Sequence, residues 1–203
     1  MPTDGHFTVL PAISSERTFS RRALAQTFFS AIAAGFTSPL FSALHPIRRH
    51  LLDVALLDLA DDHLPANGEP LFLSAQQIAT LDVLSEAIVP GALRVRAAQF
   101  IDLLLSADTH DVQQNFLAAL NASESASQDR FHVTLFSLTA TQLHDLLVDL
   151  SGESSSDRKH FENLKDWIAG AYYSSEIGLR ELGWTPDRVF PQFPSCPHSE
   201  GHV

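Results

Sequence analysis

Apolar residues recur at helical spacing in one segment after another beyond residue 70, and this periodicity constrains the fold more than any other feature. Two of these segments also carry a helix-start signal. Ser74 and Gln77 form the pattern of a capping box, in which each side chain satisfies the other residue's free backbone N–H group. Thr139 and Gln142 repeat the pattern before a second leucine-rich run. The sequence therefore predicts an all-α, compact multi-helix domain.

The expected helices follow from the same periodicity. They are a helix from Ser74 to a stop at Pro90-Gly91, then helices over 92–105, 108–120, 139–150 and 157–173, and a short helix capped by Ser174 or Ser175. We expect polar residues 121–129 to form a turn and residues 151–157 to form a loop. The apolar segment 131–138 fits either a helix or a strand.

The domain boundaries follow from breakers in the chain. Residues 45–70 read as a linker with a short amphipathic helix, and a polar loop is expected from Asp61 to Pro70 because that segment is rich in proline, glycine and asparagine. The main helical domain is expected over 71–185. The final segment, 186–203, contains four prolines and is expected to run extended over a surface.

The N-terminal 44 residues have the layout of an export signal. Arg21 and Arg22 are followed by an uncharged, weakly apolar stretch from Ala23 to Leu44. Adjacent arginines favour the twin-arginine route, which carries folded cargo, and predict a periplasmic protein. An uncleaved membrane anchor and a chance arginine pair before a buried helix are the alternatives. The best-placed cleavage site, Leu40 to Ala43, contains the unsuitable Phe41, so the signal either is cut there or stays attached at the periplasmic face of the inner membrane.

Composition excludes several classes of function. The net charge of −11 opposes binding to nucleic acid or anionic lipid, because both are polyanions. The single cysteine cannot form a disulfide within the chain. The motifs of covalent haem attachment, dinucleotide binding, phosphate loops, zinc proteases and serine hydrolases do not occur.

No set of residues in the sequence resembles a catalytic or cofactor-binding site, so we expect neither in this chain. The histidines up to residue 160, including His50, are scattered and are interpreted as ordinary surface residues. In the tail, Cys196, His198 and His202 are weak metal-ligand candidates. The same tail could instead lie on a partner or have no fixed structure.

Three groups of residues resemble the gluconate 2-dehydrogenase subunit 3 family. The first is the run from Leu81 to Ala92, which includes Ile-Val-Pro-Gly-Ala, followed by Phe100-Ile101-Asp102. The second runs from Phe161 and includes Tyr-Tyr-Ser-Ser-Glu-Ile-Gly over 172–178. The third is Glu181 to Trp184 with the closing Cys-Pro-His of 196–198. The resemblance spans roughly residues 72–198.

This resemblance implies a small accessory subunit of a membrane-associated FAD-dependent dehydrogenase acting on sugars or sugar acids. A large subunit would hold FAD and substrate, a cytochrome c subunit with haem c would take the electrons, and the small subunit would escort the flavoprotein through the twin-arginine machinery. Hydride transfer would then belong to the partner's flavin. The residues implied for partner contact are Tyr172, Tyr173, Glu176, Gly178, Trp184 and Cys196.

Two rival hypotheses remain open at the level of sequence. One is an independent exported helical module that binds metal through its Cys/His tail. The other is an enzyme in its own right.

Overall fold

Several helices begin at a residue whose side chain caps them, namely Ser74, Thr139 and Ser175. The computed structural model describes residues 46–63 and 69–183. These ranges contain seven α-helices, three short 3-10 helices and no strand, which confirms the all-α fold for this part of the chain. In chain order the elements are η2 (His50–Leu52), α2 (Val54–His63), α3 (Ala75–Ile88), η4 (Ala92–Val95), α4 (Ala97–Ser106), α5 (His110–Phe131), η5 (Leu135–Ser137), α6 (Ala140–Ser151), α7 (Arg158–Tyr173) and α8 (Glu176–Glu181).

Both predicted capping boxes are confirmed. At the start of α3, the Gln77 backbone N–H donates to the Ser74 Oγ at 3.2 Å, and the Ser74 N–H donates to the Gln77 Oε1 at 2.8 Å. Thr139 and Gln142 make the equivalent pair of bonds at 3.3 and 3.0 Å at the start of α6. Each box satisfies two N–H groups that a helix start would otherwise leave without partners.

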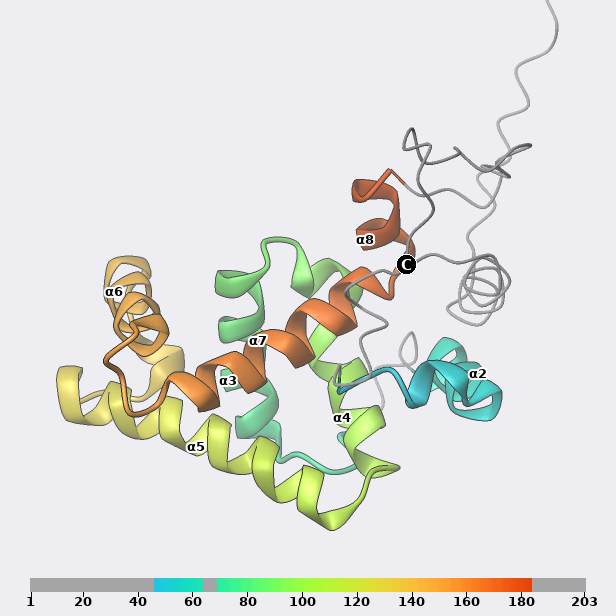
Figure 1. Cartoon of the computed structure of the whole chain (residues 1–203), viewed down its shortest axis with the longest axis horizontal. Coiled ribbons are helices and arrows are strands. Elements are labelled where there is room, and N and C mark those ends of the chain that lie inside the picture. The colour runs from blue at the N-terminus through green and yellow to red at the C-terminus, as the bar shows by residue number, and fades with distance from the viewer. Residues whose placement is uncertain (1–45, 64–68, 184–203) are drawn as a thin grey trace, which may run out of the picture.

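Helix α7 crosses the middle of the molecule and packs against α3, α4, α5, α6 and α8 (Figure 1). Helix α6 lies at the left-hand end of that view and α2 at the right-hand end. Trp167 of α7 is 1% exposed, and its ring meets the edge of Phe116 of α5 at a centroid distance of 5.8 Å. Helix α4 is buried over nearly all of its length, as expected for a helix surrounded by others.

The predicted continuous helix over 92–105 is wrong. Residues Ala92–Val95 form a 3-10 turn, and Arg96 then adopts a left-handed conformation with φ 53° before α4 begins at Ala97. The Arg96 N–H group bonds to the carbonyl groups of Ala92 and Leu93, which closes the turn. The apolar periodicity is the same on both sides of this break, so the pattern alone could not reveal it.

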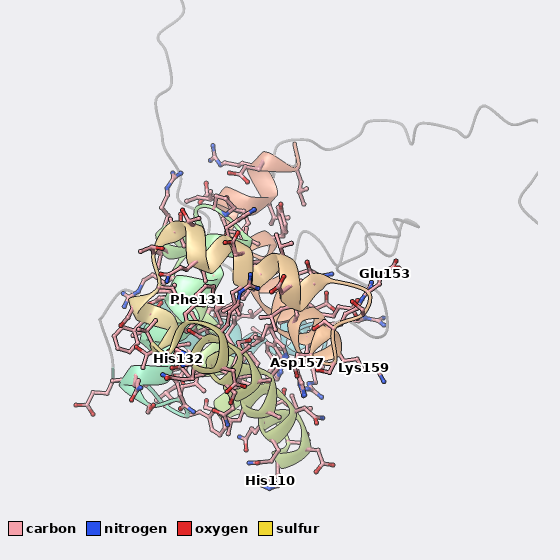
Figure 2. All side chains as sticks on the ribbon, turned by 90° about the vertical axis from the view of Figure 1, so that its left-hand side faces the viewer. His110, Phe131, His132, Glu153, Asp157 and Lys159 are labelled. Atoms are coloured by element: carbon pink, nitrogen blue, oxygen red, sulfur yellow. The ribbon has the colours of Figure 1, made fainter. Side chains whose placement is uncertain are left out.

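The predicted turn over 121–129 is also wrong, because α5 continues through it to Phe131. Tertiary contacts hold the polar half of this helix in place. Glu124 accepts the Leu135 N–H at 3.2 Å, the Ser127 Oγ donates to the Val133 carbonyl at 2.9 Å, and an ion pair joins Arg130 to Asp149 of α6. Figure 2, which views the left-hand side of Figure 1, labels both ends of α5 and the loop between α6 and α7.

Three further expectations concern segment ends. The loop expected from Asp61 begins later than predicted, since α2 runs to His63. The expected export signal with Arg21 and Arg22 and the proline-rich tail lie outside the described residues. Among the helices that are described, none combines the length and apolar character needed to span a bilayer.

Candidate functional site

The sequence blocks around residues 90 and 175 meet in space, and this junction is the candidate functional site. Gly91 has φ +96°, a conformation that side-chain-bearing residues rarely adopt. A Cβ atom at this position would lie 3.3 Å from the Tyr172 hydroxyl oxygen. The close approach of a glycine turn to the end of α7 therefore joins α3 and η4 to α7.

Glu86 braces the same turn from the other side. Its two carboxylate oxygens accept the N–H groups of Gly91 at 2.9 Å and Leu93 at 3.1 Å. These two backbone donors stabilise the ionised form and lower the pKa of Glu86 below its ordinary value. The turn that follows the Pro90-Gly91 stop is thus held in one shape and presents Leu93, which is 49% exposed, to solvent.

Ser175 fixes the start of α8 against the end of α7, as the sequence predicts for one of the two serines. Its Oγ accepts the Gly178 N–H at 3.1 Å and donates to the Tyr172 carbonyl at 2.6 Å. Gly178 packs directly on that carbonyl, and a Cβ atom there would overlap the Tyr172 backbone. Arg180 pairs with Glu176 one helical turn earlier, at 2.6 Å.

The residues implied for partner contact are found in different environments. Tyr172 is 1% exposed and Gly178 is buried, so both shape the interior of this chain, whereas Tyr173 and Glu176 are partly exposed. The Tyr172 hydroxyl is buried at this junction, and the side chain that acts on it is Glu181 at the end of α8. Burial, followed by the nearby Glu181 carboxylate, raises the pKa of Tyr172 to about 12, so the phenol stays protonated.

The remaining site candidates cannot be placed. Trp184 and the weak metal-ligand candidates Cys196, His198 and His202 lie outside the described residues. Within residues 46–63 and 69–183, no three metal-ligating side chains gather in one place.

The large apolar side chains exposed in the described part of the chain are mostly aliphatic. Only one of the eight large exposed side chains there is aromatic. They are Val54, Leu59, Leu71, Leu93, Val133, Phe136, Val148 and Leu182.

Sequence reasoning missed two polar anchors. Asp102 of α4 is 4% exposed and accepts the N–H groups of all three residues that precede the α3 cap, from 71 to 73, at 2.7, 3.0 and 2.6 Å. The sequence did contain a signal for this anchor, because Asp102 stands within an apolar run. A carboxylate inside a protein is rarely left without partners, so this position indicates a hydrogen-bonded residue.

The second missed anchor is His50, and its interpretation as a surface histidine is wrong. The residue is 6% exposed, and its Nε2 lies 2.9 Å from the Asp108 Oδ2. The two residues are 58 positions apart, so no local spacing could have paired them.

The described part of the chain is thus an all-helical domain in which a braced glycine turn and two buried polar anchors serve internal packing. The model of the family described as gluconate 2-dehydrogenase subunit 3 matches residues 75–189, which begin at α3 and include α8. The chain therefore belongs to the gluconate 2-dehydrogenase subunit 3 family. No curated protein and no solved structure matches it.

Proposed function

We propose that the chain is the non-catalytic small subunit of a membrane-associated, FAD-dependent, gluconate 2-dehydrogenase-like oxidoreductase. It binds the large flavoprotein subunit, supports its maturation and directs its twin-arginine export to the periplasm. The observation that carries the proposal is the family match over 75–189, which covers more than half of the chain. Membership of a family of dehydrogenase subunits implies partner subunits.

In this proposal the chemistry belongs to the partners. The large subunit holds FAD and the substrate, and a cytochrome c subunit carries haem c and removes the electrons. The complex works in the periplasm, at the face of the inner membrane. The present chain supplies shape, binding surface and the leader with Arg21 and Arg22.

The junction between η4 and α8 suggests how the family blocks serve binding. Tyr172 and Gly178 are buried and set the position of α8 relative to α7. The partly exposed Tyr173 and Glu176 then become the members of this block available to a partner. The resemblance also implies Trp184 and Cys196 as contacts, and both lie outside the described residues. A rigid, preformed surface lowers the entropic cost of association.

The test is co-expression with the large flavoprotein subunit. Replacing both Arg21 and Arg22 with lysine removes the twin-arginine signal but keeps the charge, and the expected result is loss of FAD-loaded flavoprotein from the periplasm. Arg17→Lys, a change at another leader arginine, is the matched control and should leave export unchanged. Equal periplasmic flavoprotein with the double lysine variant contradicts the export role. A flavoprotein that does not co-purify with this chain contradicts the subunit role separately.

A further inference from the structure

Residues 46–52, which we call the strap, dock on the helical domain although they precede its first α-helix. Ile47 is fully buried and Leu51 is 9% exposed, and both belong to the same apolar core as α4, α5 and α7. Arg48 and Arg49 between them are exposed. The strap therefore lies across the domain with one apolar edge inward and two arginines outward.

A buried polar latch fastens the strap to the turn between α4 and α5. The Asp108 Oδ2 lies 2.9 Å from the His50 Nε2 and 2.5 Å from the Arg49 Nη2. The His50 side chain is 7% exposed and the Asp108 side chain is 1% exposed. The Asp108 Oδ1 also accepts the Thr109 N–H at 2.6 Å, so both oxygens of this carboxylate are engaged. The Arg49 Nε also lies 3.3 Å from the His50 Nε2 and would need that nitrogen as an acceptor. A carboxylate can only accept, so the shorter contact, with Asp108, requires the proton of the neutral imidazole on Nε2.

The other side of the His50 ring faces the apolar interior. Its centroid lies 6.3 Å from that of Trp167 of α7, at an interplanar angle of 39°. A second proton on this ring would therefore place a cation against the core, where charge is poorly solvated.

Four effects decide whether that second proton is accepted. Burial disfavours it most strongly, and the Arg49 cation opposes it as well. The carboxylates of Asp108 and, to a smaller extent, Asp53 favour it. The balance lowers the pKa of His50 below its ordinary value of 6.5. Among these groups, Arg49 and Asp53 come from the strap side and Asp108 from the domain, while α7 contributes the uncharged ring of Trp167.

We propose that the strap is an acid-releasable clasp: proton uptake by His50 opens residues 46–52 from the α4–α5–α7 surface while the helical domain stays folded. Acid opens the strap, and does not close it, because the pKa of His50 is lowered in the closed strap. At a pH between the lowered pKa of His50 in the closed strap and its ordinary value of 6.5, the closed strap binds fewer protons than the open one. Acid therefore favours opening in that pH range. One proton taken up allows the open population to rise by at most about tenfold per pH unit.

This inference goes beyond the proposed function and does not depend on it. It concerns the purified full-length chain alone, without a flavoprotein. A strap that does not open leaves the subunit role intact, and a failed export test leaves the strap intact.

Limited tryptic cleavage after Arg48 and Arg49 is the measurement, because both side chains are exposed but their backbone is accessible to a protease only when the strap opens. The rate is measured from pH 7.5 to 5.5, with the cut identified by mass spectrometry. It is divided at each pH by the cleavage rate of a peptide of residues 44–54, which removes the pH dependence of trypsin itself. When reclosing is faster than cleavage, this ratio reports the open population.

For the wild-type chain we expect the ratio to rise as the pH falls below about 6.5, by no more than about tenfold per pH unit, with unchanged far-ultraviolet circular dichroism. His50→Gln keeps a neutral donor towards Asp108 but cannot titrate, so its ratio should stay flat. Arg49→Gln removes a cation that opposes the second proton, so its ratio should start higher at pH 7.5 and rise less on acidification. A wild-type ratio that stays constant, or that rises together with loss of helical signal, overturns the proposal. If the strap of His50→Gln is open at every pH, Arg49→Gln decides instead. A cleavage ratio in Arg49→Gln that rises as steeply with acid as in the wild type then overturns the proposal.

Discussion

Replacing Asp102 is expected to loosen the start of the helical domain, because one buried carboxylate holds three consecutive backbone N–H groups. In Asp102→Asn the side-chain oxygen can take the position of Oδ1, which serves residues 72 and 73 at 3.0 and 2.6 Å. The amide NH₂ group then faces the Leu71 N–H, 2.7 Å from the former Oδ2. Two donors in contact cost about 1–3 kcal/mol, the usual penalty for a buried group left without a partner.

Asp102→Ala removes both acceptor oxygens and with them all three hydrogen bonds, so the expected loss grows to about 2–5 kcal/mol. The loss stays within this range because the Leu71 and Phe72 N–H groups are only partly buried and water can reach them. A domain of this size is typically stable by about 5–15 kcal/mol, so this loss is a large share of the total. The assay is urea unfolding followed by circular dichroism, with the midpoint and slope fitted separately.

Asp145→Asn is the matched control, since Asp145 is an exposed acid on α6 and should change stability by less than about 0.5 kcal/mol. A midpoint for Asp102→Asn that coincides with that of the control would refute the reasoning. It would show that water replaces the carboxylate at these three donors.

Two further predictions concern the junction between η4 and α8. Gly178→Ala places a Cβ atom into the Tyr172 backbone, so we expect thermal unfolding to show a loss of about 3 kcal/mol or more in stability. Gly152→Ala is the control and should be tolerated far better, because the nearest atom to its new Cβ is 3.2 Å away. Similar losses for the two variants would show that α8 shifts freely. Glu86 stabilises the folded chain above its ordinary pKa near 4.5, and that contribution disappears as the pH falls through its lowered folded value. The difference in unfolding free energy between wild type and Glu86→Gln should therefore shrink as the pH falls from about 5 to about 3. A difference independent of pH would show that the negative charge of Glu86 does not stabilise the turn.

The sequence predicted the helix starts best, because a cap is a local device. Ser74, Thr139 and Ser175 each bond to a backbone N–H within three residues, and such patterns are visible in the letters alone. The extension of α5 was not visible in this way. Its polar half is held by Leu135 and Asp149, which lie beyond the helix in the chain.

The candidate site was predicted only in part. The blocks around Gly91 and Tyr172 could be found from the resemblance, but their contact is tertiary and has no signature in the sequence. The expectation that Tyr172 faces a partner contrasts with its 1% exposure, since aromatic side chains serve cores and interfaces equally well. The latch at His50 depends on a partner 58 residues away, beyond the reach of any spacing rule.

The docked strap also sets a boundary for processing of the chain. A peptidase needs several residues of extended, accessible backbone around the bond that it cuts. The burial of Ile47, His50 and Leu51 withholds such a stretch from residue 47 onward while the strap is closed. If the proposed leader is removed while the strap is closed, we expect the cut to fall before the strap, so that residues 46–52 stay with the domain. The length of any leader that leaves is thus set by the folded domain as well as by the peptidase's own preference.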